Sequence, residues 1–452
     1  MLIIYVKVVA IVKLAGKIID VLRRNWPIIL ANAVSLYLSV SHWNPYDVRY
    51  FIMWYDKYFS QGRLLEVYTG PPEEKVAYFP LAVIIFTLFH TLAVTLSNDI
   101  FVWRLIDKIP LLVSFNLVYF LLVKRYGKPA GYLWLVTFAS YSVIMGYQFD
   151  LIIALFILLA ILSLEKKNYE VYALWISLAT LIKQVLVVLL LVPFVELVKK
   201  KNTRGIAKYL CVSGITLAVF VIPFLMVDPW SFIAKTFFFH AKRLPQFSIW
   251  AVPYYLSGFN PDVIPLWVYD LWVFTYAAFL AWVTYRMFVE KNFTYIKFLK
   301  YINIVVAGFL IFTKVNNVPY ILWMAPSIIA IVFSNENENN ENRVILKKIA
   351  SVYIFSNIIV ILTSISLTFP SMVVGYPIYI AEDQNWIPAD KFIVDSGGPY
   401  SIVNLALYLR PILPVREFFT ILADVSHYLV AVLCIVHVML LLYIVIKLIR
   451  YF

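Results

Sequence analysis

Residues 418–446 read FFTILADVSHYLVAVLCIVHVMLLLYIVI, and after Asp424 this run contains no Asp, Glu, Lys or Arg. A helix that crosses a bilayer needs about 20 mainly apolar residues, which this run supplies. The run is continuously apolar and lacks the alternation of barrel strands, so it predicts a helix. Comparable segments occur at about 26–43, 79–97, 109–123, 129–146, 151–164, 171–198, 206–226, 265–288, 298–313, 318–333 and 344–368.

The composition of the whole chain agrees with this reading. The 452 residues are 63% hydrophobic and 14% charged, whereas soluble domains have about 25% charged residues. The mean hydropathy is +0.85. Such a chain cannot cover a set of soluble domains with polar surface. We predict an all-α polytopic membrane protein with about 11–13 spans.

The net charge of +13 has two possible meanings, nucleic-acid binding or membrane orientation. With the N-terminus inside, most of the 38 Lys and Arg residues fall on segments that would face the cytoplasm. These segments are 1–25, 124–128, 165–170, 199–208, 286–300, 334–348 and 447–452. We therefore predict a multi-pass plasma-membrane protein with both termini cytoplasmic and no nucleic-acid partner.

Local details refine this topology. Lys7, Lys13 and Lys17 interrupt the first 25 residues, which we interpret as an amphipathic helix on the cytoplasmic membrane surface. The crossing count requires that either 79–97 or 109–123 is not a full span, and we expect 79–97 to be re-entrant or interfacial. Segment 171–198 is read as two short helices that meet at Lys183. SNENENNEN at 334–342 is read as a solvated loop.

The sequence lacks the common motifs that mark metal, hydrolytic and nucleotide-binding sites. Cys211 and Cys434 both lie in apolar runs, so neither a disulfide framework nor a zinc site is supported. No hydrolytic triad, P-loop, HExxH or dinucleotide-binding fingerprint appears, and we expect no cofactor.

The predicted orientation gathers polar residues on the outer side. Three large loops lie there, at 44–78, 227–264 and 369–416. The polar residues on this side or in the outer half of the membrane include Asp47, Asp56, Asp150, Lys183, His240, Lys242, Arg243 and Lys314. A helical bundle with its polar residues on one face is expected to work at that face.

Two acidic residues each allow two interpretations. Asp47, in WNPYDVRYF at 43–51, follows the first span, where a carboxylate is unfavourable unless it is paired or functional. It is either a helix-end carboxylate beside Arg49 or a catalytic base. Asp150 in GYQFD begins a span, where a carboxylate suits a helix N-terminus. Asp150 is either a carboxylate that stabilises this helix N-terminus or a substrate contact.

The cationic residues are similarly ambiguous. Lys183 and Lys314 are flanked by apolar residues with no acid adjacent in sequence, so they either snorkel to the interface or bind an anion. The run from His240 to Arg243 is either a loop that contacts lipid headgroups or a phosphate clamp, for which Lys242 and Arg243 are suited.

Several short motifs together resemble a known family. Asp47-(x)2-Tyr50, QGRLLEVY at 61–68 and VAYFPLAV at 76–83 resemble the first outer loop of GT-C glycosyltransferases. More narrowly, they resemble the polyprenyl-phosphate-mannose-dependent enzymes of glycosyltransferase family 87. GYQFD at 146–150, LIKQ…VP at 181–193 and KVNNVPYILWMAP at 314–326 follow in the order of that family. The resemblance covers about residues 26–330.

The resemblance implies a GT-C-type transmembrane bundle with an extracytoplasmic active site. It implies transfer of a hexose, mannose by preference, from a polyprenyl- or dolichyl-phosphate donor to a lipid-linked or glycolipid acceptor among the membrane lipids. Asp47 would be the general base of an inverting reaction. His240, Lys242, Arg243, Lys183 and Lys314 would hold the donor phosphate, and Tyr50, Asp56 and Asp150 would be possible substrate contacts.

The same resemblance divides the chain into a cytoplasmic segment 1–25, a catalytic module 26–330, and C-terminal helices 331–452 with the outer loop 369–416. No acidic residue accompanies Asp47 closely, since Asp56 is the next outer carboxylate, so metal-independent transfer is favoured. A retaining reaction would need a second carboxylate near the first, and Asp150 is the obvious candidate.

Two other classes of function stay open. A transporter or lipid flippase also has interrupted apolar segments and intramembrane lysines, although here the charges gather on one side and no repeat is seen. A non-catalytic scaffold or chaperone would not need an acid at the mouth of the first span. The Ile-, Tyr- and Lys-rich composition suggests a prokaryotic, archaeal plasma membrane.

Overall fold

The computed structural model describes residues 23, 25–334, 340–380, 385–398 and 401–452. The predicted amphipathic helix at 1–25 lies almost wholly outside the described residues, as does most of the predicted loop at 334–342. The end of that loop is helical, because α18 begins at Asn340.

Six helical stretches in the described part of the chain are long and apolar enough to cross a membrane. They are the pair α4 (Ile100–Asp107) and α5 (Ile109–Tyr126), then α11 (Thr203–Leu225), α15 (Leu266–Val289), α16 (Tyr295–Phe312), α18 (Asn340–Val374) and α21 (Leu413–Tyr451). In the described residues the regular secondary structure is helical apart from one small hairpin, which confirms the predicted all-α class.

The other apolar segments fold as shorter pieces than the prediction of 11–13 spans assumed. They are a helix over 25–41, then α3 (Pro80–Leu96), α6 (Lys128–Leu135), α7 (Ala139–Gly146), α8 (Asp150–Glu165), α9 (Tyr169–Thr180), η3 (Gln184–Leu190), α10 (Leu191–Lys199), η7 (Val318–Trp323) and α17 (Ala325–Phe333). Turns and prolines at helix starts divide these segments. The re-entrant placement of 79–97, which forms α3, stays a prediction.

The chain breaks at Lys183, as the sequence predicted. Helix α9 ends at Thr180, and Lys183 is extended, with φ −133° and ψ 111°, before η3 begins. The carbonyls of Leu181 and Ile182 accept hydrogen bonds from the backbone N–H groups of Leu81 (3.0 Å) and Phe79 (3.3 Å) at the start of α3. Unpaired backbone groups at two helix ends thus satisfy one another.

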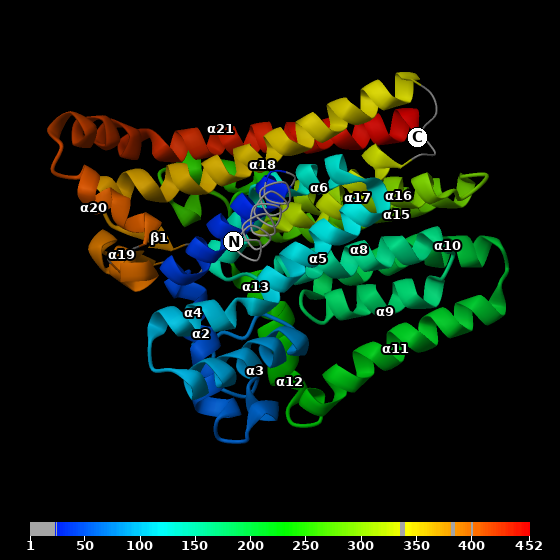
Figure 1. Ribbon diagram of the computed structural model, residues 1–452, viewed down its shortest axis with the longest axis horizontal. Coiled ribbons are helices and arrows are strands. Elements are labelled where there is room, and N and C mark those ends of the chain that lie inside the picture. The colour runs from blue at the N-terminus through cyan, green and yellow to red at the C-terminus, as the bar shows by residue number, and fades with distance from the viewer. Residues whose placement is uncertain (1–22, 24, 335–339, 381–384, 399–400) are drawn as a thin grey trace, which may run out of the picture.

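Helices α8 and α16 lie in the core of the bundle. Every residue of α16 from Tyr295 to Ile311 except Lys297 is buried, and α8 packs against α5, α9 and α17. Helices α18 and α21 run side by side along one flank (Figure 1). By contrast, α11 packs on α9 and leaves most of its surface exposed.

The three predicted outer loops fold into short elements at one end of the bundle (Figure 1). The first forms α2 (Pro45–Met53), η1 (Trp54–Phe59) and η2 (Leu64–Glu66). The second forms α12 (Pro229–Ile233), η4 (Ala234–Phe238), α13 (Phe239–Lys242), η5 (Ile249–Ala251), α14 (Val252–Leu256) and η6 (Pro261–Val263). The third forms β1 (Ile378–Ile380), β2 (Asn385–Ile387), α19 (Ala389–Gly397), η9 (Ile402–Asn404) and α20 (Leu405–Leu409).

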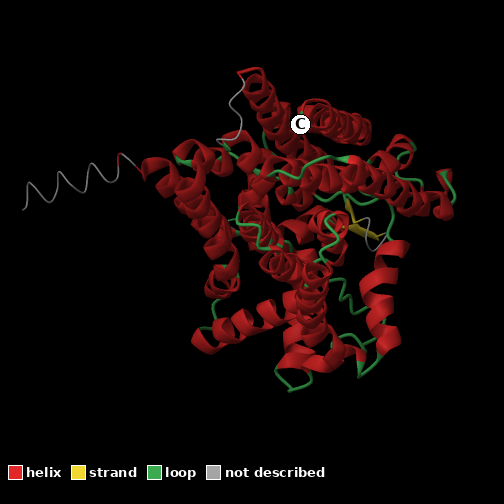
Figure 2. Cartoon of the chain, turned by 90° about the vertical axis from the view of Figure 1, so that its right-hand side faces the viewer, coloured by secondary structure: helices red, strands yellow, loops and turns green. Residues whose placement is uncertain are grey.

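Hydrogen bonds join these three loops. Lys235 Nζ in the second loop donates to the Glu74 carbonyl in the first at 2.9 Å. The Trp43 N–H at the start of the first loop donates to the Ser396 carbonyl in the third at 2.9 Å. The strands pair as an antiparallel hairpin with Tyr379 opposite Trp386, a small feature among the helices in Figure 2. The three loops therefore form a single packed cap over this end of the bundle.

Candidate functional site

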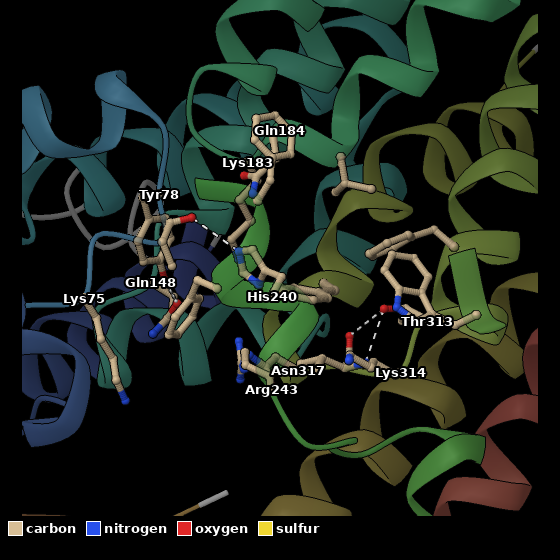
Figure 3. A pocket seen from close by; sticks show the side chains of 18 of the residues that line it. Lys75, Tyr78, Gln148, Lys183, Gln184, His240, Arg243, Thr313, Lys314 and Asn317 are labelled. Carbon is tan, nitrogen blue, oxygen red and sulfur yellow. Dashed lines mark hydrogen bonds between the residues drawn. The ribbon is translucent and has the colours of Figure 1, made fainter. Parts of the chain in front are cut away.

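A cavity of about 670 Å³ lies between this cap and the bundle. Its wall is built from α2, the chain after η2, the turn before α8, η3, α13, α15 and the segment 313–323. Figure 3 shows side chains from these separate segments meeting around one space. Six of the nine residues predicted for the site line it: Asp47, Tyr50, Lys183, His240, Arg243 and Lys314.

Asp47 is held in the first turn of α2 by two side-chain amides. Asn44, the N-cap of α2, donates from Nδ2 to Asp47 Oδ2 at 2.8 Å. Gln148 donates from Nε2 to the same oxygen. The Tyr78 hydroxyl donates in turn to Gln148 Oε1 at 2.7 Å. The carboxylate is thus oriented by amides from two separate segments, the start of α2 and the turn before α8.

Lys183 lies in the wall and has a buried acidic partner. Its Nζ lies 2.8 Å from Asp150 Oδ1 and 2.9 Å from Oδ2, and Trp323 Nε1 donates to Oδ1 at 2.7 Å. The ring of Tyr320 lies 4.3 Å from Nζ. No acid is adjacent to Lys183 in sequence, and its acidic partner comes instead from the start of another helix, α8. Asp150 is fully buried behind the wall and does not line the cavity.

Lys314 also has a carboxylate partner from a distant segment. Its Nζ lies 2.6 Å from Asp270 Oδ1 on α15. The Lys314 side chain is 3% exposed, whereas that of Asp270 is 47% exposed and faces the cavity. Here too the acidic partner is distant in sequence, since Asp270 precedes Lys314 by 44 residues. The pair gives the cavity a second carboxylate besides Asp47.

The second outer loop contributes His240 and Arg243. His240 Nε2 lies 3.3 Å from the Ala77 carbonyl. Burial, with a smaller effect from the charge of Arg243, lowers the pKa of His240 to about 3. A pKa this low leaves His240 neutral at physiological pH, so we expect it to contribute a hydrogen bond instead of a positive charge. Arg243 Nη2 donates to Gln246 Oε1 at 3.0 Å, and the side chain of Lys242 lies outside the described part of the structure.

Of the two remaining predicted residues, Tyr50 lines the cavity and Asp56 does not. Tyr50 lines the cavity, and its hydroxyl accepts a 2.8 Å hydrogen bond from Arg49 Nη2. Asp56 is exposed on η1 and is absent from the cavity lining. The proposed assignment of Asp56 to substrate therefore gains no support from its position.

The polar lining residues that sequence reasoning missed include Lys75, Tyr78, Gln148 and Asp270. Lys75 Nζ lies 5.2 Å from the ring centre of Tyr46 and 5.5 Å from that of Tyr50. Tyr78 and Gln148 lie inside the motifs VAYFPLAV and GYQFD, so the motifs were a signal for them. Asp270 is an acid inside an apolar segment, which was also a usable signal.

An apolar groove of about 320 Å³ adjoins the cavity. The two share Gln184, Val187 and Phe237, and residues of α3, α9 and α11 complete the groove. Val187 and Phe237 are 43% and 47% exposed. Because α11 is an exposed apolar helix, the groove leads from the polar cavity to an exposed apolar flank of the bundle.

A metal site has no visible donor set. Within the described ranges, no group of three or more His, Cys, Asp or Glu side chains is placed to hold a metal ion. The two carboxylates of the cavity, Asp47 and Asp270, instead have amide and lysine partners.

Comparison with solved structures finds a similar fold, whereas the sequence comparisons find no match. No protein-family model matches the sequence, and no curated protein matches it. The crystal structure of ArnT from Cupriavidus metallidurans bound to undecaprenyl phosphate is similar, with a TM-score of 0.44 and 13% sequence identity. The match covers 94% of this chain and 77% of that chain. The case for a function therefore rests on the cavity.

Proposed function

We propose that this protein is a membrane glycosyltransferase that moves a hexose from a polyprenyl-phosphate-linked donor to a lipid-linked or glycolipid acceptor. One observation carries the proposal: an oriented carboxylate and several cationic side chains line the same cavity, and an apolar groove adjoins that cavity. A prenyl-linked sugar phosphate has matching parts, namely an acceptor hydroxyl to deprotonate, a phosphate leaving group and a long apolar tail.

Asp47 is the proposed general base. Glycosyl transfer needs a group that takes the proton from the attacking hydroxyl, within about 2.6–3.2 Å in the reacting complex. Asp47 lines the cavity, and the amides of Asn44 and Gln148 both bind its Oδ2, which fixes the direction of the carboxyl group. Attack from the side opposite the leaving phosphate inverts the anomeric centre.

The cations are the proposed partners of the phosphate. Negative charge builds up on the leaving phosphate during transfer, and fixed cations in a dry cavity stabilise it. Lys183 and Lys314 approach from the break before η3 and from segment 313–323, and Arg243 approaches from the second outer loop. Lys75 adds a fourth cation. Neutral His240 would donate or accept a hydrogen bond, and Lys242 stays a candidate on its sequence position alone.

The prenyl tail is proposed to lie in the apolar groove. An isoprenoid chain in the groove would bury apolar surface that is otherwise in contact with water. The phosphate at its end would then lie beside Gln184 and Lys183. The resemblance to family 87 favours mannose as the sugar and an extracytoplasmic site. The same proposal divides the chain into segment 1–25, catalytic module 26–330 and C-terminal helices 331–452. The hydrogen bond from Trp43 to Ser396 adds the third outer loop to the surroundings of Asp47.

The test is transfer of labelled mannose from dolichyl-phosphate-mannose to a membrane lipid extract by purified protein. Asp47→Asn is compared with Asp262→Asn, which alters an exposed carboxylate of the second outer loop outside the cavity. We expect labelled product from the wild type and Asp262→Asn, and a loss of about 10²–10⁴-fold for Asp47→Asn.

Two outcomes would reject the proposal. Full activity of Asp47→Asn would reject the mechanism. Absence of product from the wild type with both dolichyl-phosphate-mannose and dolichyl-phosphate-glucose, together with movement of the intact donor across vesicles, would favour a flippase instead.

A further inference from the structure

A fully buried lysine outside the cavity, Lys108, binds four backbone carbonyls. It lies at the junction of α4 and α5 and is 0% exposed. Its Nζ lies 3.4 Å from the Leu38 carbonyl, 3.2 Å from that of Ser39 and 3.2 Å from that of Met145, and it also donates to the His42 carbonyl. An ammonium so far from solvent needs compensation for its lost hydration.

The compensation comes from two helix ends. Leu38 and Ser39 lie in the last turn of the helix over 25–41, and Met145 lies in the last turn of α7. Each helix C-terminus carries roughly half a negative charge on its unpaired carbonyls. Two converging C-termini therefore offset about one positive charge. The neighbouring acid, Asp107, lies with its Oδ2 3.0 Å from His90 Nδ1.

The two segments that leave these helix ends carry the two amides that hold Asp47. Asn44 follows the helix over 25–41, and Gln148 follows α7. The Asn44 N–H donates to the Gly146 carbonyl at 3.2 Å, which joins the two segments directly. Both side chains donate to Asp47 Oδ2. A change in the spacing of the helix ends would therefore move both donors.

We propose that Lys108 is a positioning residue for Asp47. By binding the ends of the helix over 25–41 and of α7, the Lys108 ammonium sets the separation of Asn44 and Gln148 and so the direction of the Asp47 carboxylate. This inference rests on the proposed function, because its consequence is a rate of transfer. It assigns no contact between Lys108 and the substrate.

The experiment measures kcat and KM for the donor with Lys108→Met, which keeps most of the length of the side chain and removes its charge and its hydrogen-bond donors. A displacement of about 1 Å at a reacting group costs roughly a hundredfold in rate. We therefore expect kcat to fall about a hundredfold with KM unchanged within about twofold. In a Gln148→Leu background the same substitution should lower kcat by much less, because residues acting through one contact are not additive.

Lys199→Met is the matched control. Lys199 Nζ also binds carbonyls at a helix end, those of Met287 (3.3 Å) and Glu290 at the end of α15, but it is far from Asp47 and does not line the cavity. We expect it to lower thermal stability and to leave kcat per folded molecule unchanged. An equal fall in kcat for Lys199→Met would reduce the effect of Lys108 to general destabilisation and overturn the proposal.

A wild-type kcat for Lys108→Met, with Asp47→Asn inactive, would also overturn it and leave the proposed function intact. Full activity of Asp47→Asn would reject the proposed function instead. If Lys108→Met does not fold, Lys108→Gln retains hydrogen-bond donors without the charge. A fall in kcat of about tenfold is then expected, and a wild-type kcat would contradict the proposal.

Discussion

Lys183 and Asp150 form a buried ion pair, in which Nζ lies 2.8 Å and 2.9 Å from the two carboxylate oxygens. The pair joins the start of α8 to the break before η3 and presents the lysine, but not the aspartate, to the cavity. A lysine on the cavity wall thus has its charge balanced before any anion binds. The pair predicts that the two residues have separable effects on stability and on activity.

The first prediction concerns Asp150→Ala. Removal of one partner leaves a buried ammonium uncompensated, so the free energy of unfolding should fall by about 3–5 kcal/mol. Thermal unfolding in detergent measures the change. The double variant Asp150→Leu with Lys183→Met should recover most of the stability and remain inactive, if Lys183 contacts the donor phosphate. A stable and fully active double variant would remove Lys183 from the phosphate site.

The second prediction concerns pH. Burial lowers the pKa of His240 from 6.5 to about 3, so between these values the unfolded chain binds a proton that the folded chain does not. The free energy of unfolding therefore falls as the pH drops below 6.5. Above pH 6.5 His240 is neutral in both states and does not change the free energy of unfolding with pH. His240→Gln should show a shallower loss of stability than the wild type between pH 7.5 and pH 5.

The same pKa bears on the rate of transfer. His240 remains neutral across the neutral pH range, so its protonation should not appear in a kcat profile between about pH 6 and pH 8. An inflection near pH 6.5 that disappears in His240→Gln would show that this histidine titrates in the working enzyme.

The third prediction concerns Gly70 in the first outer loop. An added Cβ there would overlap the carboxylate of Glu74 and the hydroxyl of Tyr58, which hydrogen-bond each other. Gly70→Ala should therefore lower the free energy of unfolding by about 1–3 kcal/mol. Gly214→Ala on α11 is the control, because an added Cβ meets no atom within 4 Å. Equal effects of the two substitutions would contradict the packing around Glu74.

The fourth prediction tests the tail groove. Ala218 lines the groove on α11, whereas its neighbour Val219 is 63% exposed and is absent from the lining. Ala218→Phe should raise KM for a long-chain prenyl donor about tenfold, a loss of about 1.4 kcal/mol in binding. It should affect a short-chain donor little, and Val219→Phe should affect neither. Equal inhibition with both donors would place the tail elsewhere.

Much of the outer site was accessible from sequence because its residues lie in short motifs. Asp47, Tyr50, His240 and Arg243 were predicted on one side of the membrane, and they line one cavity. The break at Lys183 was also predictable, since a charged residue in the middle of a long apolar run disfavours a continuous span. Asp56 shows the limit of this reasoning: it lies in the correct loop but points outward from η1.

The amino-acid sequence alone determined the all-α class, the long loops between apolar segments and the residue types of the cavity, because apolar runs and motif positions are local properties of the chain. Only the tertiary structure decided which charges meet. Asp150 with Lys183, Asp270 with Lys314, and Lys108 with two helix ends are contacts between segments far apart in sequence. Ion pairing and burial depend on distance in space, and helix packing brings these groups within hydrogen-bonding range.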